Sequence, residues 1–343
     1  MAKQPRILAG EIAAITGAAR GIGRATAQAF VRHGMRVAIG DVDADAARQT
    51  AAQLGPSTVA LALDVTERAS FAAFLDGAEE QLGPLDVLVN NAGIMPIGRF
   101  VDEDDLTARR MVDINLHGVI LGTKLALERM VPRDRGHIVN ISSQAGKFGT
   151  PGGATYSATK HAVVGLTEAV RGELRLMGAH VDVSYVMPYV VNTELGSHLG
   201  KARGLKELQP EQVADAIVEA LQHRIVDVWV PKSAKRQYTL GTVMPRALAE
   251  GVGRALKADR VLAGADHDMR RGYELRAARS EPALASASEP AALEPPAGPT
   301  PPREHDSAGE PPVAVASAAE PASAEPVLDP APERERIIPS GGE

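Results

Sequence analysis

The sequence predicts an α/β protein in which a doubly wound, seven-stranded parallel sheet carries helices on both faces. Up to about residue 230, short apolar runs alternate with amphipathic stretches of helical period. Parallel neighbouring strands need a long crossover connection, and a helix usually supplies it. Aromatic residues make up only 3% of the 343 residues, which suits helices packed on a sheet better than a sandwich held by aromatic side chains.

The first part of the chain supplies five expected strands, each a short apolar run. EIAAIT leads into a glycine-rich loop, and the helical stretch after it ends at Gly34, a typical helix stop. RVAIGD and TVALALDV are each followed by another helical stretch, and LDVLVNNAG and GHIVNISS flank the longest one. These patterns predict strands at 11–16, 36–41, 58–65, 85–93 and 136–143, and helices at 22–34, 43–54, 67–82 and 103–131.

The second part completes the sheet. A helix is expected over 154–178, followed by the strands VDVSYVMP (181–188) and VDVWVP (226–231). Beyond them, residues 240–258 repeat apolar side chains at helical spacing beside Arg246, Arg254 and Lys257. We expect this stripe to pack on the domain or on a second subunit. A membrane surface and a lid over a hydrophobic substrate are the alternatives, although the stripe lacks Trp and Phe anchors. Its apolar residues are Leu240, Val243, Met244, Ala247, Leu248, Val252 and Leu256.

Composition excludes several classes of function. The chain has no cysteine, so disulfides, thiolate metal sites and thiol catalysis are ruled out, and a reducing compartment fits. We find no secretory signal, no apolar run of 18 residues and no metal-binding cluster, and we expect a cytoplasmic protein without a membrane span.

The net charge of −6 belongs to the C-terminal tail. Residues 281–343 hold 12 acidic and 3 basic side chains, so the rest of the chain is close to neutral and has no basic stripe for nucleic acid. The tail is rich in Ala, Pro and Glu and poor in large apolar side chains. Such a segment cannot bury enough surface to offset its ordering entropy, so it is expected to be disordered.

The loop TGAARGIG (16–23) stands between the first strand and the first helix. Glycines at this junction let the backbone approach a pyrophosphate, and the helix N-terminus supplies N–H donors and positive potential. Three glycines alone are a weak signal, because tight turns use glycine without binding anything. Their place after the first strand of an alternating pattern favours a nucleotide site.

The loop resembles the T-G-x-x-x-G-x-G motif of the short-chain dehydrogenase/reductase superfamily. NNAG (90–93), Asn115, the pair Ser142–Ser143 and YSATK (156–160) follow in the order and spacing of that family, and the match covers roughly residues 8–231. The resemblance implies a Rossmann-type nicotinamide-binding and catalytic domain over 1–235, with a helical extension at 236–280 and the tail at 281–343. It also implies reversible hydride transfer between an alcohol and a ketone.

The resemblance assigns catalytic roles to four residues. Tyr156 is the acid/base, and Lys160, one helical turn later, is expected to favour its phenolate and to hold the nicotinamide ribose. Ser143 binds the substrate oxygen, and its neighbour Ser142 is the weaker candidate. Asn115 orders a water that links Lys160 to solvent. Each residue taken alone has an ordinary structural explanation, such as a surface pair or a helix cap. Those explanations do not account for the occurrence of all four residues together at the spacings of the family.

Asp41, at the end of the second strand, can bind both hydroxyls of an adenosine ribose and repels a 2′-phosphate. Arg20 favours such a phosphate, but Val42 supplies no second cation beside it. We therefore expect NAD rather than NADP. The resemblance adds further cofactor contacts at Gly17, Gly21, Ile22, Gly23, Asp64, Val65, Asn91, Ala92, Gly93, Pro188, Val191 and Thr193.

One stretch departs from the family pattern. In MPYVVNTEL, Tyr189 replaces the glycine that usually follows Pro188, which excludes an easy positive φ and adds bulk near the reacting ring. The loop over 189–210 is the usual substrate lid. With Ile94, Met95, Ile97, Phe148, Leu195, His198 and Leu199 it suggests an apolar cavity for a steroid-, terpenoid- or lipid-like alcohol, although packing of the domain explains these residues nearly as well.

Two further expectations concern assembly and alternative functions. Paired helices, here 103–131 and 154–178, join subunits in this superfamily, so we expect a homodimer or homotetramer. The alternatives to an NAD-linked enzyme are an NADP-linked ketoreductase and a nicotinamide-binding scaffold that acts through its tail.

Overall fold

The computed structural model describes residues 4–200, 202, 206–257 and 260–278. The chain divides into two units, residues 1–289 and 290–343, and every described residue belongs to the first. The predicted disordered tail, 281–343, lies outside the described residues.

The described residues form one parallel sheet of seven strands in the order β3-β2-β1-β4-β5-β6-β7. The predicted doubly wound α/β fold is therefore confirmed. The order in which the strands are added reverses at β1, which has β2 on one side and β4 on the other. In sheets of this kind, ligands bind at such a switch point, beyond the carboxyl ends of the strands. The strands are β1 Ile12–Thr16, β2 Arg36–Asp41, β3 Thr58–Ala62, β4 Val87–Asn90, β5 Gly136–Ile141, β6 Val181–Pro188 and β7 Asp227–Val230.

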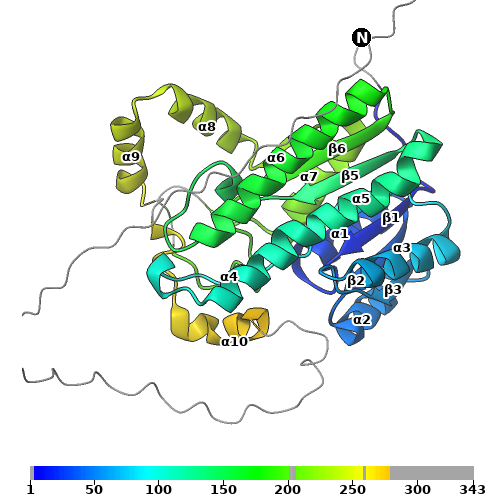
Figure 1. Cartoon of the computed structure of the whole chain (residues 1–343), viewed down its shortest axis with the longest axis horizontal. Coiled ribbons are helices and arrows are strands. Elements are labelled where there is room, and N and C mark those ends of the chain that lie inside the picture. The colour runs from blue at the N-terminus through cyan, green and yellow to red at the C-terminus, as the bar shows by residue number, and fades with distance from the viewer. Residues whose placement is uncertain (1–3, 201, 203–205, 258–259, 279–343) are drawn as a thin grey trace, which may run out of the picture. The chain divides into compact units, whose positions relative to one another are not determined.

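Helices cover both faces of the sheet (Figure 1). The α-helices are α1 Gly21–Arg32, α2 Ala44–Leu54, α3 Arg68–Leu82, α4 Asp105–Val112, α5 Gly118–Met130, α6 Ala154–Met177, α7 Pro210–His223, α8 Ser233–Val243, α9 Arg246–Ala255 and α10 His267–Ala278. Four short helical segments join them: η1 Phe100–Asp102, η2 Asp113–His117, η3 Val131–Arg133 and η4 Gln144–Gly146.

Alternate strand residues face opposite layers, because successive side chains of a strand point to opposite faces. On β1, Ala14 packs into the layer formed by α3, α5 and α6, whereas Ala13 and Ile15 pack into the layer formed by α1, α2 and α7. All three side chains are completely buried. The two apolar layers hold the strands so that their carboxyl ends meet along one edge of the sheet.

Helix α7 is absent from the sequence-based prediction. Pro210 occupies its first turn, and Gln209 and Gln212 form a reciprocal capping box. Its buried side chains, Val213, Ala214, Ile217, Val218, Ala220 and Leu221, recur at helical spacing, so the pattern was present in the sequence.

The prediction of one continuous helix over 240–258 is wrong. The segment is broken after Val243, because Pro245 cannot continue the helix, and α9 starts anew at Arg246. Of the two packings expected for the stripe, the one on the domain is not seen, because Leu240, Leu248 and Val252 are exposed in the single chain; packing on a second subunit stays a prediction. Figure 1 shows α8 and α9 extending beyond the sheet and its covering helices. Among the described residues, no helix is long and apolar enough to cross a membrane.

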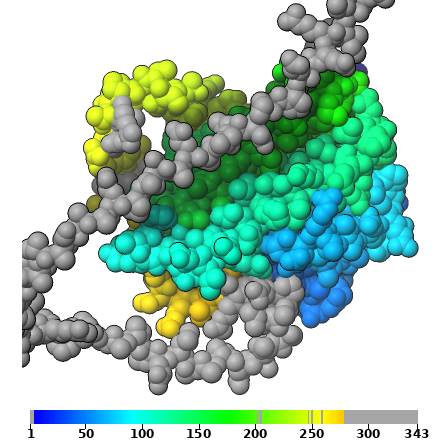
Figure 2. Space-filling model, viewed as in Figure 1, coloured from blue at the N-terminus to red at the C-terminus, as the bar shows by residue number. Residues whose placement is uncertain are grey.

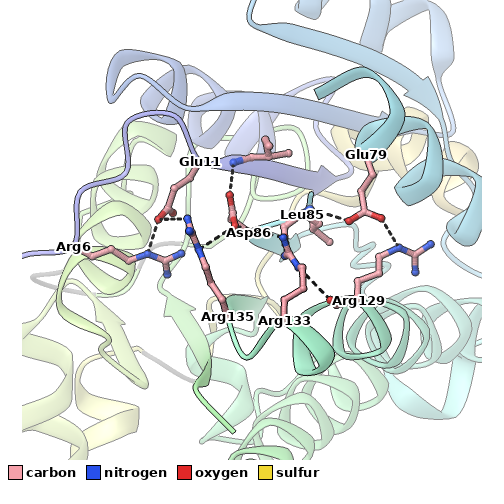
Figure 3. Close-up of polar contacts among 9 residues, drawn as sticks. Arg6, Glu11, Glu79, Leu85, Asp86, Arg129, Arg133 and Arg135 are labelled. Carbon is pink, nitrogen blue, oxygen red and sulfur yellow. Dashed lines mark hydrogen bonds and ion pairs between the residues drawn. The ribbon is translucent and has the colours of Figure 1, made fainter. Parts of the chain in front are cut away.

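A polar network ties the amino ends of the central strands together (Figure 3). Glu11, just before β1, pairs with Arg6 at 2.8 Å and with Arg135 at 3.5 Å. Arg135 also pairs with Asp86 at 3.2 Å, and Asp86 accepts a hydrogen bond of 3.1 Å from the backbone of Ile12. These contacts fix β1, β4 and β5 at the edge of the sheet opposite their carboxyl ends.

Candidate active site

The glycine loop after β1 is held against the loop after β4. Thr16 Oγ1 accepts hydrogen bonds from the backbone N–H groups of Asn91 (3.0 Å) and Ala92 (2.9 Å). The Asn91 side chain donates in turn to the carbonyls of Thr16 and Gly17, both at 2.9 Å. These bonds replace the sheet ladder, which explains why β4 ends at Asn90 instead of reaching residue 93 as predicted.

Two glycines of this loop are required by close packing. Gly17 has φ +63°, and a Cβ there would lie 2.7 Å from Cα of Ala92. A Cβ on Gly23 would lie 2.6 Å from the carbonyl oxygen of Gly17. The loop thus passes bare backbone close to the first turn of α1, whose N–H groups lack intrahelical partners. This is the geometry of a pyrophosphate site.

The first turn of α1 also faces the loop after β6. Gly21 has φ +58°, and a Cβ on it would lie 3.3 Å from Cγ2 of Thr193. Ile22 is partly buried against the layer that contains α1. The structure therefore brings predicted cofactor residues of the β1 and β6 loops together at the switch point.

Asp41 lies at the carboxyl end of β2, with each oxygen bonded to backbone. Oδ2 accepts from the N–H of Ala19 at 3.0 Å, and Oδ1 accepts from that of Asp43 at 3.1 Å. Burial raises the pKa of the Asp41 carboxyl, and the two backbone donors and Arg20 oppose the rise. Asp43, not Asp41, caps α2 by accepting from the N–H of Ala46. Asp41 is thus free of a capping role.

Arg20 is surrounded by carboxylates. Its guanidinium pairs with Asp43 and lies 3.6 Å from Glu194. Both contacts are partly exposed, so each contributes little stability. They do, however, engage the cation that sequence analysis weighed as a partner for a 2′-phosphate.

Two predicted adenine contacts follow β3. Asp64 Oδ1 accepts from the N–H and the hydroxyl of Thr66, at 2.9 and 2.7 Å, so Asp64 shapes the turn. Val65 is buried, and a Cβ on Gly118, at the start of α5, would lie 3.0 Å from its Cγ2. The predicted β3 runs to residue 65, but the strand ends at Ala62 because this turn begins there.

The predicted catalytic side chains converge at the start of α6. Tyr156 and Ser143 share a side-chain hydrogen bond, and Nζ of Lys160 lies 5.6 Å from the centre of the Tyr156 ring. The Ser143 oxygen accepts from the N–H of Ala145 at 3.1 Å, which leaves its hydroxyl proton for donation. The Ser142 hydroxyl instead donates to the carbonyl of Lys160, so the preference for Ser143 over Ser142 agrees with the geometry.

The expected lowering of the Tyr156 pKa does not occur in the chain alone. Burial raises the pKa of Tyr156 to about 12, and the hydrogen bond with Ser143 only partly opposes this. Burial also lowers the pKa of Lys160 to about 8. The Lys160 ammonium donates to the carbonyl of Ile141 at 3.0 Å rather than to the phenol, which explains why it does not offset the burial of Tyr156.

Asn115 holds the loop that follows β4. It is fully buried, and its side-chain amide both donates to and accepts from the backbone of Ile94, at 2.8 Å each. It lies in η2, a π-helical segment that interrupts the predicted helix 103–131, and such segments frequently occur at functional sites. A Cβ on Gly93 would lie 3.2 Å from Asn115 Oδ1 and 3.6 Å from Lys160 Nζ, so Gly93 leaves space between them.

The segment after β6 is not disturbed by Tyr189. Tyr189 has no positive φ, and its ring packs with the layer of α1 and α7, which does not contain Tyr156. The glycine-like backbone conformation is thus not needed at this position. Pro188 ends β6, and Val191 forms an isolated parallel bridge with Leu208.

Apolar residues near Tyr156 come from more of the chain than predicted. Ile94, Met95 and Leu199 are buried in the same apolar group as Tyr156. Phe148 does not join them: it is largely exposed and packs edge-on against Tyr238, 5.2 Å away. In its place the group contains residues of the C-terminal extension that sequence analysis missed, namely Val261, Leu262 and Ala277, with Tyr273 packed against it.

A glycine cradle at a helix N-terminus, a carboxylate at the end of β2 and a Ser–Tyr–Lys group together fit a nicotinamide nucleotide and an alcohol or ketone. The short chain dehydrogenase family model matches residues 11–204, more than half of the chain. The chain therefore belongs to the short-chain dehydrogenase/reductase superfamily, as the motifs predicted. It is an oxidoreductase that acts on CH–OH groups with a nicotinamide cofactor.

Individual relatives show the range of this similarity. Sorbitol dehydrogenase of Cereibacter sphaeroides is 40% identical over 188 residues, which cover 54% of this chain and 73% of that protein. The 3-alpha-(or 20-beta)-hydroxysteroid dehydrogenase of Mycobacterium tuberculosis is 39% identical over 188 residues, covering 55% and 72%. A short-chain dehydrogenase/reductase from Burkholderia phymatum, crystallised with NAD, superposes with a TM-score of 0.64 at 27% identity and covers 69% of this chain and 94% of its own.

Proposed function

We propose that this protein is an NAD-dependent dehydrogenase of hydrophobic secondary alcohols, working reversibly as a ketoreductase. The observation that carries the proposal is the group at the start of α6, where Ser143 hydrogen-bonds Tyr156 and the Lys160 ammonium lies beside the ring. The bound nicotinamide supplies the hydride acceptor or donor.

Tyr156 is the acid/base of the proposed reaction. Because burial raises its pKa to about 12, the phenol holds its proton at neutral pH and can give it to the oxygen of a ketone that is being reduced. Ser143 donates its hydroxyl proton to the same oxygen and so fixes it within reach of the phenol. In the direction of oxidation, the phenolate is needed, and its negative charge is stabilised by the nearby Lys160 ammonium.

Asn115 has a positioning role in this proposal. Its two hydrogen bonds with Ile94 fix the loop that carries Gly93, beside the Lys160 ammonium. This places Asn115 between the cofactor-binding loop and the proposed proton path. The relay from Lys160 to solvent through an ordered water remains part of the proposal.

The charges at the end of β2 support NAD over NADP. Asp41, Asp43 and Glu194 lie around Arg20, so a 2′-phosphate would meet three carboxylates and a cation that already has partners. Each oxygen of Asp41 keeps a lone pair besides the one used by backbone, so the carboxylate can accept from ribose hydroxyls. The Burkholderia relative crystallised with NAD adds support. An NADP-linked ketoreductase is the second candidate.

The apolar surroundings of Tyr156 support the hydrophobic substrate class. Ile94, Met95 and Leu199 offer no polar side-chain group to a polyol. The hydroxysteroid dehydrogenase relative agrees with this class, whereas the sorbitol dehydrogenase relative favours a polyol. Both types of alcohol therefore belong in the test.

The test is NADH formation from NAD with secondary alcohols graded from small to sterol-sized, and with sorbitol. Tyr156→Phe should lower kcat by roughly 10²-fold or more, because the acid/base group is lost. Tyr238→Phe is the matched control, since Tyr238 packs on Phe148 and Trp229 away from the site, and it should keep full activity. Equal turnover in both variants would refute the role of Tyr156, and a preference for sorbitol would refute the substrate class.

The alternative of a scaffold that acts through its tail is tested by deleting residues 281–343. We expect unaltered turnover, because no proposed site residue lies there. Loss of partner binding on deletion of the tail would support the scaffold.

We also propose a cytoplasmic homodimer or homotetramer joined through α4, α5 and α6. Exposed apolar side chains on α4 and α6, such as Leu106, Val112 and Leu176, support this assembly. The exposed apolar stripe on α8 and α9 is a further surface that could contact a second subunit or a membrane. Light scattering decides, and a monomer would refute the assembly.

A further inference from the structure

Arg270, on α10, is the largest completely buried side chain among the described residues. Burying a guanidinium is costly unless its N–H groups are hydrogen-bonded. The residue lies well beyond the end of the family match at residue 204, so nothing in that match accounts for it. Figure 1 and Figure 2 show α10 beside α4, and the two helices are in contact.

The guanidinium of Arg270 joins two separate loops. Its Nη1 donates to the carbonyls of Leu195 (3.0 Å) and Ser197 (2.7 Å), and its Nη2 donates to the carbonyl of Met95 at 3.0 Å. Met95 follows the cofactor-binding NNAG segment, and Leu195 follows Thr193. Nε lies 3.3 Å from the carboxylate of Glu274, which balances the buried charge.

Tyr273, one turn later on α10, strengthens the same attachment. Its hydroxyl oxygen accepts from the N–H of Met95 at 2.7 Å, and its ring lies 5.0 Å from the Arg270 guanidinium. Burial is the main cause that raises the pKa of Tyr273, and the nearby phenol of Tyr156 contributes to the rise. Tyr273 therefore stays protonated close to the proposed acid/base.

The backbone before α10 extends the attachment along the substrate loop. The N–H of Gly200 donates to the carbonyl of Val261 at 2.8 Å, and that of Asp266 donates to the carbonyl of His198 at 3.0 Å. Leu262 fills the space beside Gly153, at the start of the helix that carries Tyr156: a Cβ on Gly153 would lie 2.5 Å from it.

We propose that Arg270 is a positioning residue that clamps the loops after β4 and β6 around the substrate, so that α10 forms part of the substrate site. This rests on the proposed function. A guanidinium suits the task because its planar fork reaches three carbonyls at once, which a lysine ammonium cannot match. Without it, three carbonyls lose a buried donor and the two loops separate, whereas the glycine cradle that holds the cofactor keeps its own contacts.

The test compares Arg270→Met and Arg270→Lys with Arg271→Met. Arg271 is the next residue of α10 and is exposed, so it controls for loss of a positive charge on this helix. We expect Arg270→Met to raise the KM for the alcohol roughly tenfold or more, with the Kd for NADH within about threefold of the unaltered chain. Arg270→Lys should recover part of the loss, and Arg271→Met should change neither value.

Amide hydrogen exchange gives a readout that needs no turnover. In Arg270→Met, exchange should accelerate in residues 94–98 and 194–200 while the core strands stay protected. Unchanged exchange in both loops, or an equal loss of protection across all strands, would overturn the clamp. If the unaltered chain oxidises no alcohol, the proposed function fails, and the exchange result still decides whether Arg270 holds these loops.

Discussion

Gly17→Ala tests whether the glycine loop is shaped by its contact with the β4 loop. Gly17 has φ +63°, and a Cβ would lie 2.7 Å from the backbone of Ala92, which cannot move without disturbing the bonds to Thr16. A left-handed conformation costs an alanine about 1–2 kcal/mol. Overpacking against backbone adds about 1–3 kcal/mol. We therefore expect a total loss of about 2–5 kcal/mol in the free energy of unfolding.

Gly178→Ala is the matched control. Gly178 ends α6 with φ +70°, and a Cβ there would meet nothing within 4 Å. It should lose only the conformational part, about 1–2 kcal/mol. Urea unfolding measures both losses, and NADH fluorescence measures affinity, which should fall roughly tenfold or more in Gly17→Ala alone. Equal stability losses in the two variants, with equal NADH affinity, would refute the reasoning.

Three further changes have defined outcomes. Burial lowers the pKa of His137 from 6.5 to about 3. As the pH is lowered between these values, the unfolded chain binds a proton that the folded chain does not. The free energy of unfolding therefore decreases as the pH decreases, by about 1.4 kcal/mol per pH unit from this group. His137→Gln should flatten the slope, and an unchanged slope in acid titrations of unfolding would contradict this. Asp41→Asn should strengthen NADPH binding roughly tenfold and weaken NADH binding, in competition titrations; unchanged selectivity would argue against a carboxylate that excludes phosphate. Thr16→Val removes the acceptor for two N–H groups and should lower stability by about 1–3 kcal/mol; a smaller loss in urea unfolding would show that the loops do not depend on it.

The strands were predictable because each is buried on both faces and therefore reads as a continuous apolar run. Their ends were less so. β4 stops early because Thr16, 75 residues away in sequence, takes the N–H of Asn91 out of the ladder. Helix α7 could have been predicted from its apolar spacing and its first-turn proline. The π-helical turn at Asn115 was not predicted.

The candidate catalytic residues could be proposed from the sequence because family motifs fix them, and the structure brings Ser143, Tyr156 and Lys160 close together. The pKa of Tyr156 was not, since it depends on burial and on the carbonyl that holds Lys160. The role of Arg270 could not be predicted either. It stands beside Arg271 in the sequence, and the two differ only in that Arg270 donates to carbonyls 73 to 175 residues away. Long-range contacts of this kind leave no local pattern.

The polar network around Glu11 and Asp86 lies at the amino ends of the strands, while the proposed site lies at their carboxyl ends. Arg6 is held there twice, by Glu11 and through its backbone N–H by the carbonyl of Gln222. The start of the described chain is therefore anchored on the side of the sheet remote from the chemistry. A group attached close to Arg6 would therefore lie away from the proposed substrate site and leave substrate access open.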